Sequence, residues 1–211
     1  MKKPILINIF GASGTGKTIL ATTLTNALKL KGINAEYCRE WVKEPILNGM
    51  HTSTVNQWAI TGEQTRLLSL YMECGCDVVI TDSPVLIGKV YGKMNEVREP
   101  DMLWTHWDKH CDRFLEAHEA ISDETNTLNI MLIHDPNVKF QKFGREQDRK
   151  DSLTVELMMK GVLRDHLKIH STAFLRDFLG SGYDSSVNVL KALLRENRAI
   201  SGEIKELLCG L

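Results

Sequence analysis

The chain has 211 residues, which suits one α/β domain spanning residues 1–211 and is long enough to bury most of its apolar surface. Its 26 Lys and Arg residues are balanced by 27 Asp and Glu residues, and the net charge of −1 argues against a protein that coats nucleic acid with a broad basic face. The five cysteines are an odd set without paired C-x-x-C spacing, so they indicate neither a disulfide framework nor a structural zinc site, and we expect a reduced, cytoplasmic protein. The apolar run at residues 4–10 is too short to span a membrane and no cleavage site follows it, so we expect no membrane association.

A glycine-rich stretch directly follows that apolar run: Gly11-Ala12-Ser13-Gly14-Thr15-Gly16-Lys17-Thr18. It matches the pattern G-x-x-x-x-G-K-[ST], in which the backbone wraps round a phosphate, several N–H groups point inward, and the following helix presents its positive end. Lys17 is then expected to reach the β- and γ-phosphates, and the Thr18 hydroxyl to bind Mg²⁺. The flanks support this, because residues 5–10 read as a buried parallel strand and one face of a helix over residues 18–30 carries Leu20, Leu24, Ala27 and Leu28.

A short second strand is expected at residues 33–38, ending at Arg39-Glu40-Trp41. Open α/β sheets bind ligands beyond the carboxyl ends of their strands, so these three residues are candidates for a substrate site. The alternative is that Arg39 and Glu40 belong to a solvated turn, since most charged residues are exposed. Residues 55–73 then read as a long helix, with Trp58, Gly62, Leu67, Leu68 and Tyr71 toward the core and Glu63, Gln64 and Arg66 on its other faces.

The second strong signal is the run Asp77-Val78-Val79-Ile80-Thr81-Asp82-Ser83-Pro84, a β-branched apolar strand that ends in an aspartate. Phosphoryl transfer needs a carboxylate across from the phosphate loop to hold Mg²⁺ or one of its waters. Asp82 stands where this strand leaves the sheet, so it is the candidate for that role. The spacing of Leu103, Trp107, Cys111, Phe114 and Leu115 predicts a further helix over residues 101–120.

A basic, glycine-bearing segment follows the next expected strand, residues 128–133. This segment, residues 139–150, contains Arg145 and Arg149, and it precedes a helical pattern with Leu153, Leu157, Met158 and Leu167. A mobile lid that brings arginines over phosphates has this composition, although a solvated charged loop has it too. Residues 169–175 are expected to form the last strand, and residues 187–194 and 204–208 two closing helices.

Taken together, the phosphate loop, residues 37–41, Asp82 and residues 144–150 make the chain resemble P-loop nucleoside kinases. The likeness is greatest to the ribosylnicotinamide kinase domain of bifunctional NAD-metabolism regulators and its bacterial and phage relatives. The resemblance implies an α/β P-loop NTPase fold, a three-layer sandwich with a parallel five-stranded sheet, helices on both faces and a lid at about residues 139–150. It also implies ATP and Mg²⁺ as cofactors, and transfer of the γ-phosphate to a hydroxyl of a nucleoside or nucleotide-like small molecule.

Carried over to this sequence, the resemblance implies that Gly11 to Thr18 bind ATP, that Glu40 faces the acceptor and that Asp82 serves the metal. Arg145 and Arg149 would belong to the lid and contact the nucleotide. The chain departs from the pattern after Asp82, where many nucleoside kinases have an arginine and this sequence has Ser83-Pro84. Acceptor contacts inferred from those families therefore do not transfer directly.

Three functions are compatible with this pattern. In the first, a small-molecule kinase, Glu40 accepts or orients the proton of the acceptor hydroxyl and Asp82 holds Mg²⁺, although these two roles could be exchanged. In the second, a kinase acting on a modified base or an end of DNA, the aromatic side chains available to stack on a base are Trp41, Trp58, Tyr91 and Trp104. The third is an ATPase switch that transfers phosphate to no acceptor.

Overall fold

The computed structural model describes residues 4–42, 48–49, 54–98, 113, 116, 119–121, 126–137, 139–140, 148–166, 171–173 and 176. Its strands are β1 (Ile5–Phe10), β2 (Ala35–Cys38), β3 (Val78–Thr81), β4 (Asn126–Leu132) and β5 (Ser171–Ala173). Its helices of defined extent are α1 (Lys17–Leu30), α3 (Thr54–Glu73), α4 (Ile87–Arg98) and α6 (Arg149–His166). The expected strands and helices in the described regions are therefore present, with ends that differ from the predicted ones by a few residues.

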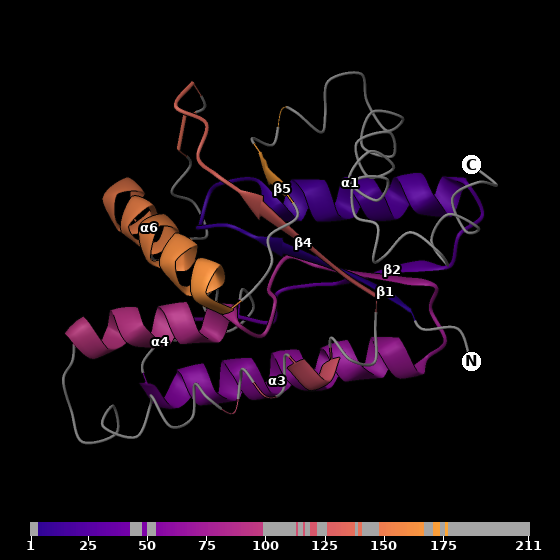
Figure 1. Ribbon diagram of the computed structural model, residues 1–211, viewed down its shortest axis with the longest axis horizontal. Coiled ribbons are helices and arrows are strands. Elements are labelled where there is room, and N and C mark those ends of the chain that lie inside the picture. Colours follow the sequence, from indigo (N-terminus) through magenta and orange to yellow (C-terminus); the bar gives the residue numbers. More distant parts are fainter. Residues whose placement is uncertain are drawn as a thin grey trace.

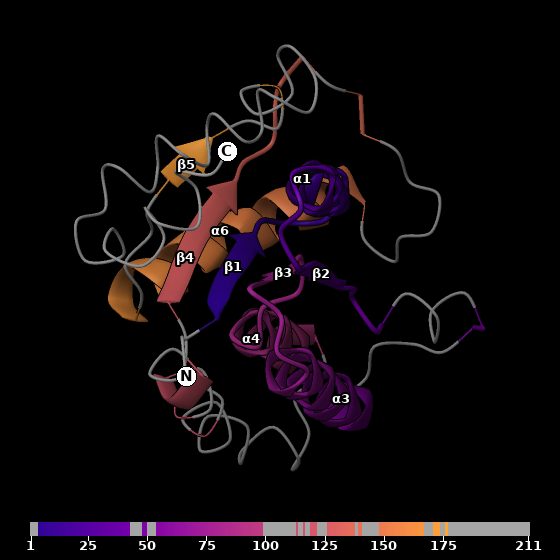
Figure 2. The ribbon, with the colours of Figure 1, turned by 90° about the vertical axis from the view of Figure 1, so that its right-hand side faces the viewer.

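The strands form one parallel sheet in the order β2-β3-β1-β4-β5, with β1 at its centre (Figure 2). Ile5 of β1 lies opposite Val78 of β3 and Asn126 of β4, so the first residues of these three strands are aligned. β5 contributes only three residues, which pair with the end of β4. Because all the strands run the same way, their carboxyl ends meet at one edge, where ligands bind in sheets of this type.

Helices cover both faces of the sheet, as predicted (Figure 1). One face packs against α1, whose Leu20, Leu24 and Leu28 join alternate residues of the strands in a buried cluster. The opposite face packs against α3, α4 and α6 in two further clusters, which contain Leu68 of α3, Leu86 just before α4 and Met159 of α6. β1 is buried along its whole length, because helices lie over both of its faces. The α/β three-layer architecture expected from the sequence is confirmed.

A row of polar or weakly polar side chains crosses four strands of this sheet: Cys38 of β2, Thr81 of β3, Asn8 of β1 and Asn129 of β4. Asn8 lies opposite both Thr81 and Asn129, and Thr81 lies opposite Cys38. All four are at most 5% exposed, and Asn8 Nδ2 donates to Asn129 Oδ1 at 3.0 Å. Buried polar groups are tolerated where they are hydrogen-bonded, and this row includes the last residues of β2 and β3, Cys38 and Thr81.

The buried face of α3 is more polar than the sequence predicted. Gln57, Thr61, Gln64 and Leu68 are each 4% exposed or less, whereas Gly62, expected in the core, is exposed. The placement of Gln64 on an outer face was therefore wrong. Its amide reaches the polar row, since Nε2 lies 3.5 Å from both Cys38 Sγ and Thr81 Oγ1. Hydrophobic periodicity assigns polar residues to the exposed face of a helix. It therefore misses a face whose polar residues are buried against other polar groups.

In α6, Leu153 and Leu157 of the predicted helical pattern are 42% and 69% exposed, while Val155, Met159 and Leu163 are buried. Several predictions fall outside the described residues: Trp104, Arg145, most of the helix expected at 101–120, the middle of the 139–150 segment, and both closing helices. Among the helices that the structure describes, none has a stretch long and apolar enough to cross a membrane.

Candidate functional site

The loop between β1 and α1 is shaped by glycines. Gly11, Gly14 and Gly16 all have positive φ angles, of 150°, 89° and 92°. At Gly11 space is also limiting, because an added Cβ would lie 2.6 Å from Thr15 Oγ1 and 2.7 Å from the Leu132 carbonyl oxygen. Gly16 is the N-cap of α1, no side chain caps this end, and the first turn carries no acidic residue. The N–H groups at the start of α1 therefore have the arrangement that suits a bound anion.

Inside the loop, the Ala12 carbonyl oxygen organises the side chains. Thr15 Oγ1 donates to it at 3.0 Å and Lys17 Nζ donates to it at 3.1 Å. A lysine held over the loop by a backbone carbonyl is already close to where a phosphate would lie. A change of side-chain torsion would let the ammonium group exchange this carbonyl for a phosphate oxygen.

The predicted pair of Thr18 and Asp82 is brought together at the carboxyl ends of β1 and β3. Thr18 Oγ1 donates to Asp82 Oδ2 at 2.6 Å, although the two residues are 64 positions apart in the chain. Tyr37 of β2 lies near the same two side chains. The pKa of Tyr37 is raised, first by burial and then by the neighbouring Asp82 carboxylate, so the phenol stays protonated.

The other oxygen of Asp82, Oδ1, is buried and has no hydrogen-bond partner among the described residues. The residue as a whole is 1% exposed. A buried carboxylate oxygen without a donor needs a cation or a water, and carboxylate and hydroxyl oxygens are the ligands that Mg²⁺ prefers. Within the described part of the chain, no three His, Cys, Asp or Glu side chains group together as metal ligands. The pair therefore suits Mg²⁺, which is commonly held by one or two protein groups together with water and substrate phosphates.

Glu40 lies beyond the end of β2, next to two tyrosines. Its charge contributes to raising the pKa of Tyr91 on α4, after the larger effect of burial, and makes a smaller contribution at Tyr37. Its neighbours Arg39 and Trp41 are exposed and half-buried, and the Trp41 backbone N–H donates to Gln64 Oε1 at 3.2 Å. The chain just beyond β2 is thus fixed to α3 through Gln64.

A second group of side chains contacts the phosphate loop from the opposite side, and the sequence did not single it out. His134 follows β4, and Ser152 and Glu156 lie on α6. His134 Nε2 is 3.0 Å from the Ser13 carbonyl oxygen, and Ser152 Oγ donates to that same oxygen. His134 does stand at the carboxyl end of a strand, which is the signal that could have found it. Nothing in the sequence pattern points to Ser152 or Glu156.

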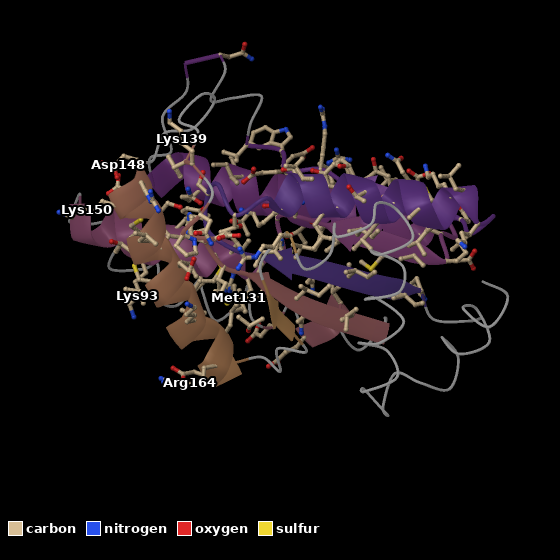
Figure 3. All side chains as sticks on the ribbon, turned by 90° about the horizontal axis from the view of Figure 1, so that it is seen from above. Lys93, Met131, Lys139, Asp148, Lys150 and Arg164 are labelled. Atoms are coloured by element: carbon tan, nitrogen blue, oxygen red, sulfur yellow. The ribbon has the colours of Figure 1, made fainter. Side chains whose placement is uncertain are left out.

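Of the two lid arginines, Arg149 is the first residue of α6 and is exposed, whereas Arg145 lies outside the described residues. Figure 3 shows Asp148 and Lys150 at the end of α6 that is remote from Arg164. The predicted lid segment, residues 139–150, thus runs into the start of α6, and α6 contacts the phosphate loop through Ser152.

The model for the AAA domain family AAA_28 matches residues 6–174, which include the phosphate loop, Asp82 and His134. The chain belongs to this AAA-domain family. No curated protein matches the sequence of this chain.

Solved structures are similar to this AAA-domain protein in fold. The NadR protein, solved in complex with NR, matches 79% of the chain with a TM-score of 0.57 and 17% sequence identity. The match covers 45% of the NadR chain, so the present chain spans less than half the length of that protein. Thymidylate kinase from Candida albicans matches 94% of both chains with a TM-score of 0.56 and 14% identity. The predicted resemblance to P-loop kinases is thus confirmed at the level of the fold.

Proposed function

We propose that the protein is an ATP- and Mg²⁺-dependent phosphotransferase that moves the γ-phosphate to a hydroxyl of a nucleoside or nucleotide-like small molecule. The observation that carries the proposal is the 2.6 Å contact between Thr18 and Asp82 beside the uncapped start of α1. It joins a site for phosphate to a site for its metal. The similarity in fold to thymidylate kinase adds support. So does the similarity to NadR, whose structure was solved in complex with the small molecule NR.

In the proposed reaction, the acceptor oxygen forms a bond to the γ-phosphorus while the bond from that phosphorus to the β,γ-bridging oxygen breaks, and ADP leaves. Residues 11–18 hold the phosphates through backbone N–H groups, and Lys17 leaves the Ala12 carbonyl to neutralise charge on the β- and γ-phosphates. Mg²⁺, when bound, would withdraw charge from the transferred group, and Thr18 and Asp82 would hold it.

Glu40 is the proposed acceptor for the proton of the attacking hydroxyl. It lies at the carboxyl end of the sheet, beyond β2, beside Tyr37 and Tyr91. The Asp82 carboxylate contributes to raising the pKa of Tyr37, so this phenol lies near the proposed metal pair. The roles of Glu40 and Asp82 could be exchanged, and the pH dependence of their variants would distinguish the two assignments.

The test is an ATP-consumption screen of the purified protein across nucleosides, nucleotides and nicotinamide riboside, with Mg²⁺ present. We expect ATP consumption that depends on an acceptor, and a loss on the order of 10²- to 10³-fold in at least one of Glu40→Gln and Asp82→Asn. Phosphate appearing on the acceptor is then identified by mass spectrometry.

Glu36→Gln is a matched control, because Glu36 pairs with Lys29 at 2.8 Å on the exposed surface of the same strand that leads to Glu40. It should leave turnover unchanged. No acceptor-dependent turnover by the wild type, or full activity in both Glu40→Gln and Asp82→Asn, would contradict the proposal. ATP hydrolysis that no acceptor alters would instead favour an ATPase switch.

A further inference from the structure

The Ser13 carbonyl oxygen, inside the phosphate loop, is held by two side chains from outside the loop. Ser152 Oγ donates to it, and His134 Nε2 lies 3.0 Å from it. The two holding groups are themselves 3.1 Å apart. Three polar atoms from the loop, the end of β4 and the first turns of α6 therefore meet at one point.

His134 is fixed in turn by Glu156 on α6. Glu156 Oε2 accepts from the His134 backbone N–H at 2.8 Å and lies 2.7 Å from Nδ1, while Lys160 Nζ donates to Oε1 at 2.8 Å. The His134 and Glu156 side chains are 12% and 9% exposed. Each ring nitrogen therefore has a polar partner, the Glu156 carboxylate at Nδ1 and the Ser13 carbonyl at Nε2. Ring orientation is thus determined by contacts at both nitrogens.

The direction of a carbonyl determines the direction of the N–H in the same peptide group. In a planar trans peptide the C=O and N–H bonds point opposite ways, so holding the Ser13 oxygen toward β4 and α6 turns the Gly14 N–H away from them. Gly14 has a φ of 89° and no side chain, so its backbone conformation is restricted less than that of other residues. Without an external contact, the Ser13–Gly14 peptide could rotate and present its carbonyl to the phosphate.

We propose that His134 and Ser152 are positioning residues that hold the Ser13–Gly14 peptide with its N–H directed into the phosphate site. This inference rests on the proposed function in one respect, namely that residues 11–18 bind the phosphates of a nucleotide. The anchor reduces the reorganisation needed when the nucleotide binds, which is how preorganised donors gain strength. It also connects the loop to α6, the helix that follows the predicted lid segment.

The test uses two substitutions of His134 that keep different nitrogen atoms. Glutamine places an amide nitrogen near the position of Nε2, so His134→Gln keeps a donor for Ser13 and loses the side-chain contact with Glu156. Asparagine places its amide nitrogen near Nδ1, so His134→Asn keeps the contact with Glu156 and loses the one with Ser13. The probe is ADP, titrated into each variant by calorimetry, with thermal unfolding as a check on folding.

We expect His134→Asn to weaken ADP binding about 10-fold, and the double variant His134→Asn with Ser152→Ala about 100-fold, while His134→Gln stays within about 3-fold of wild type. Thr154→Ala is the control for Ser152→Ala, since it removes an exposed hydroxyl from the same part of α6 that donates to the Lys150 carbonyl. Thr154→Ala should bind ADP as wild type does.

The outcomes separate this inference from the proposed function. Equal losses in His134→Asn and His134→Gln would indicate a purely structural role and overturn the inference, as would unchanged binding in the double variant. A wild type that binds ADP with the expected variant order but transfers phosphate to no acceptor would contradict the proposed kinase activity alone. A wild type that does not bind ADP would overturn both.

Discussion

The phosphate loop is held on two sides, and the two sides differ in what they contact. On the first, called the metal side after the proposed Mg²⁺ site, Thr18 donates to Asp82 Oδ2, and Asp82 Oδ1 is buried without a donor among the described residues. On the second, the anchor side, His134, Ser152 and Glu156 form hydrogen bonds at each of the polar side-chain atoms that face the loop or one another. The metal side thus leaves a hydrogen-bonding group unsatisfied, which is typical of a binding site. The anchor side satisfies its polar groups, which is typical of a structural contact.

This difference predicts that the metal side lowers the stability of the folded protein, because it keeps a buried oxygen unpaired for ligand binding. The anchor side is expected to raise that stability. An unpaired buried oxygen is costly, and native proteins keep such groups mainly where they have a use. A satisfied network of charged and polar groups raises the cost of moving any one of its members. The two sides can therefore be separated by measuring activity and unfolding on the same variants.

The largest expected effect concerns Arg145, which lies between His134 and Ser152 in the sequence. If this segment supplies a charge for chemistry as well as support, Arg145→Lys should lower kcat on the order of 10²- to 10³-fold and raise the KM for ATP by less. The reason is that a guanidinium grips two phosphate oxygens in a fork and an ammonium cannot.

Arg149→Lys is the comparison, because Arg149 is exposed at the start of α6 and should affect binding more than turnover. Steady-state kinetics on both variants decide the question. If Arg145→Lys remains within a factor of about three of wild type, a loss under roughly 0.7 kcal/mol, the anchor side only supports the loop and the lid assignment is wrong.

A smaller effect, which differs between the two sides, is expected for thermal stability. Asp82→Asn should not lower Tm, because it removes a buried charge whose Oδ1 has no partner while leaving an acceptor for Thr18. Glu156→Gln should lower stability by about 2 kcal/mol, or about 4–8 °C in Tm, because Glu156 accepts from His134 and Lys160. Calorimetric unfolding of the two variants measures both changes. A fall in Tm of more than about 4 °C in Asp82→Asn would mean that the metal side is structural as well.

The smallest effect is the pH dependence of the anchor side. Burial raises the pKa of Glu156, but hydrogen bonds from Lys160 and from the backbone and ring of His134 outweigh it, so the net pKa lies below the ordinary value of 4.5. A group with a lowered pKa in the folded protein contributes stability above its unfolded pKa and loses it as pH falls through the folded value. The difference in Tm between wild type and Glu156→Gln should therefore be constant at neutral pH and shrink below about pH 4.5.

Glu63→Gln is the control for this pH series. The Glu63 carboxylate accepts from Arg66 on the exposed side of α3, where an ion pair contributes little. Its Tm should follow that of the wild type from neutral to acid pH. A gap between wild type and Glu156→Gln that widens in acid would show that Glu156 is not held as a charged acceptor in the folded protein.

The sequence by itself determined the central strand, the phosphate loop and the helix after it. Residues 5–10 are continuously apolar, the eight-residue motif needs glycines where φ is positive, and Leu20, Leu24 and Leu28 recur at the spacing of one helix face. These are local signals, because each depends on residues within a few positions of one another. The end of β3 was found in the same way, as an apolar strand followed by Asp82.

Only the tertiary structure decided which polar side chains would be buried together. Gln64 was expected on an outer face and His134 had no assigned role, yet one reaches the polar row of the sheet and the other the Ser13 carbonyl. Ser13 and Ser152 are 139 positions apart, and their contact depends on how α6 packs against β1 and β4. A hydrophobic pattern specifies the face that a helix turns to the core, but a polar side chain is buried only where a distant partner satisfies it, and the fold alone supplies that partner.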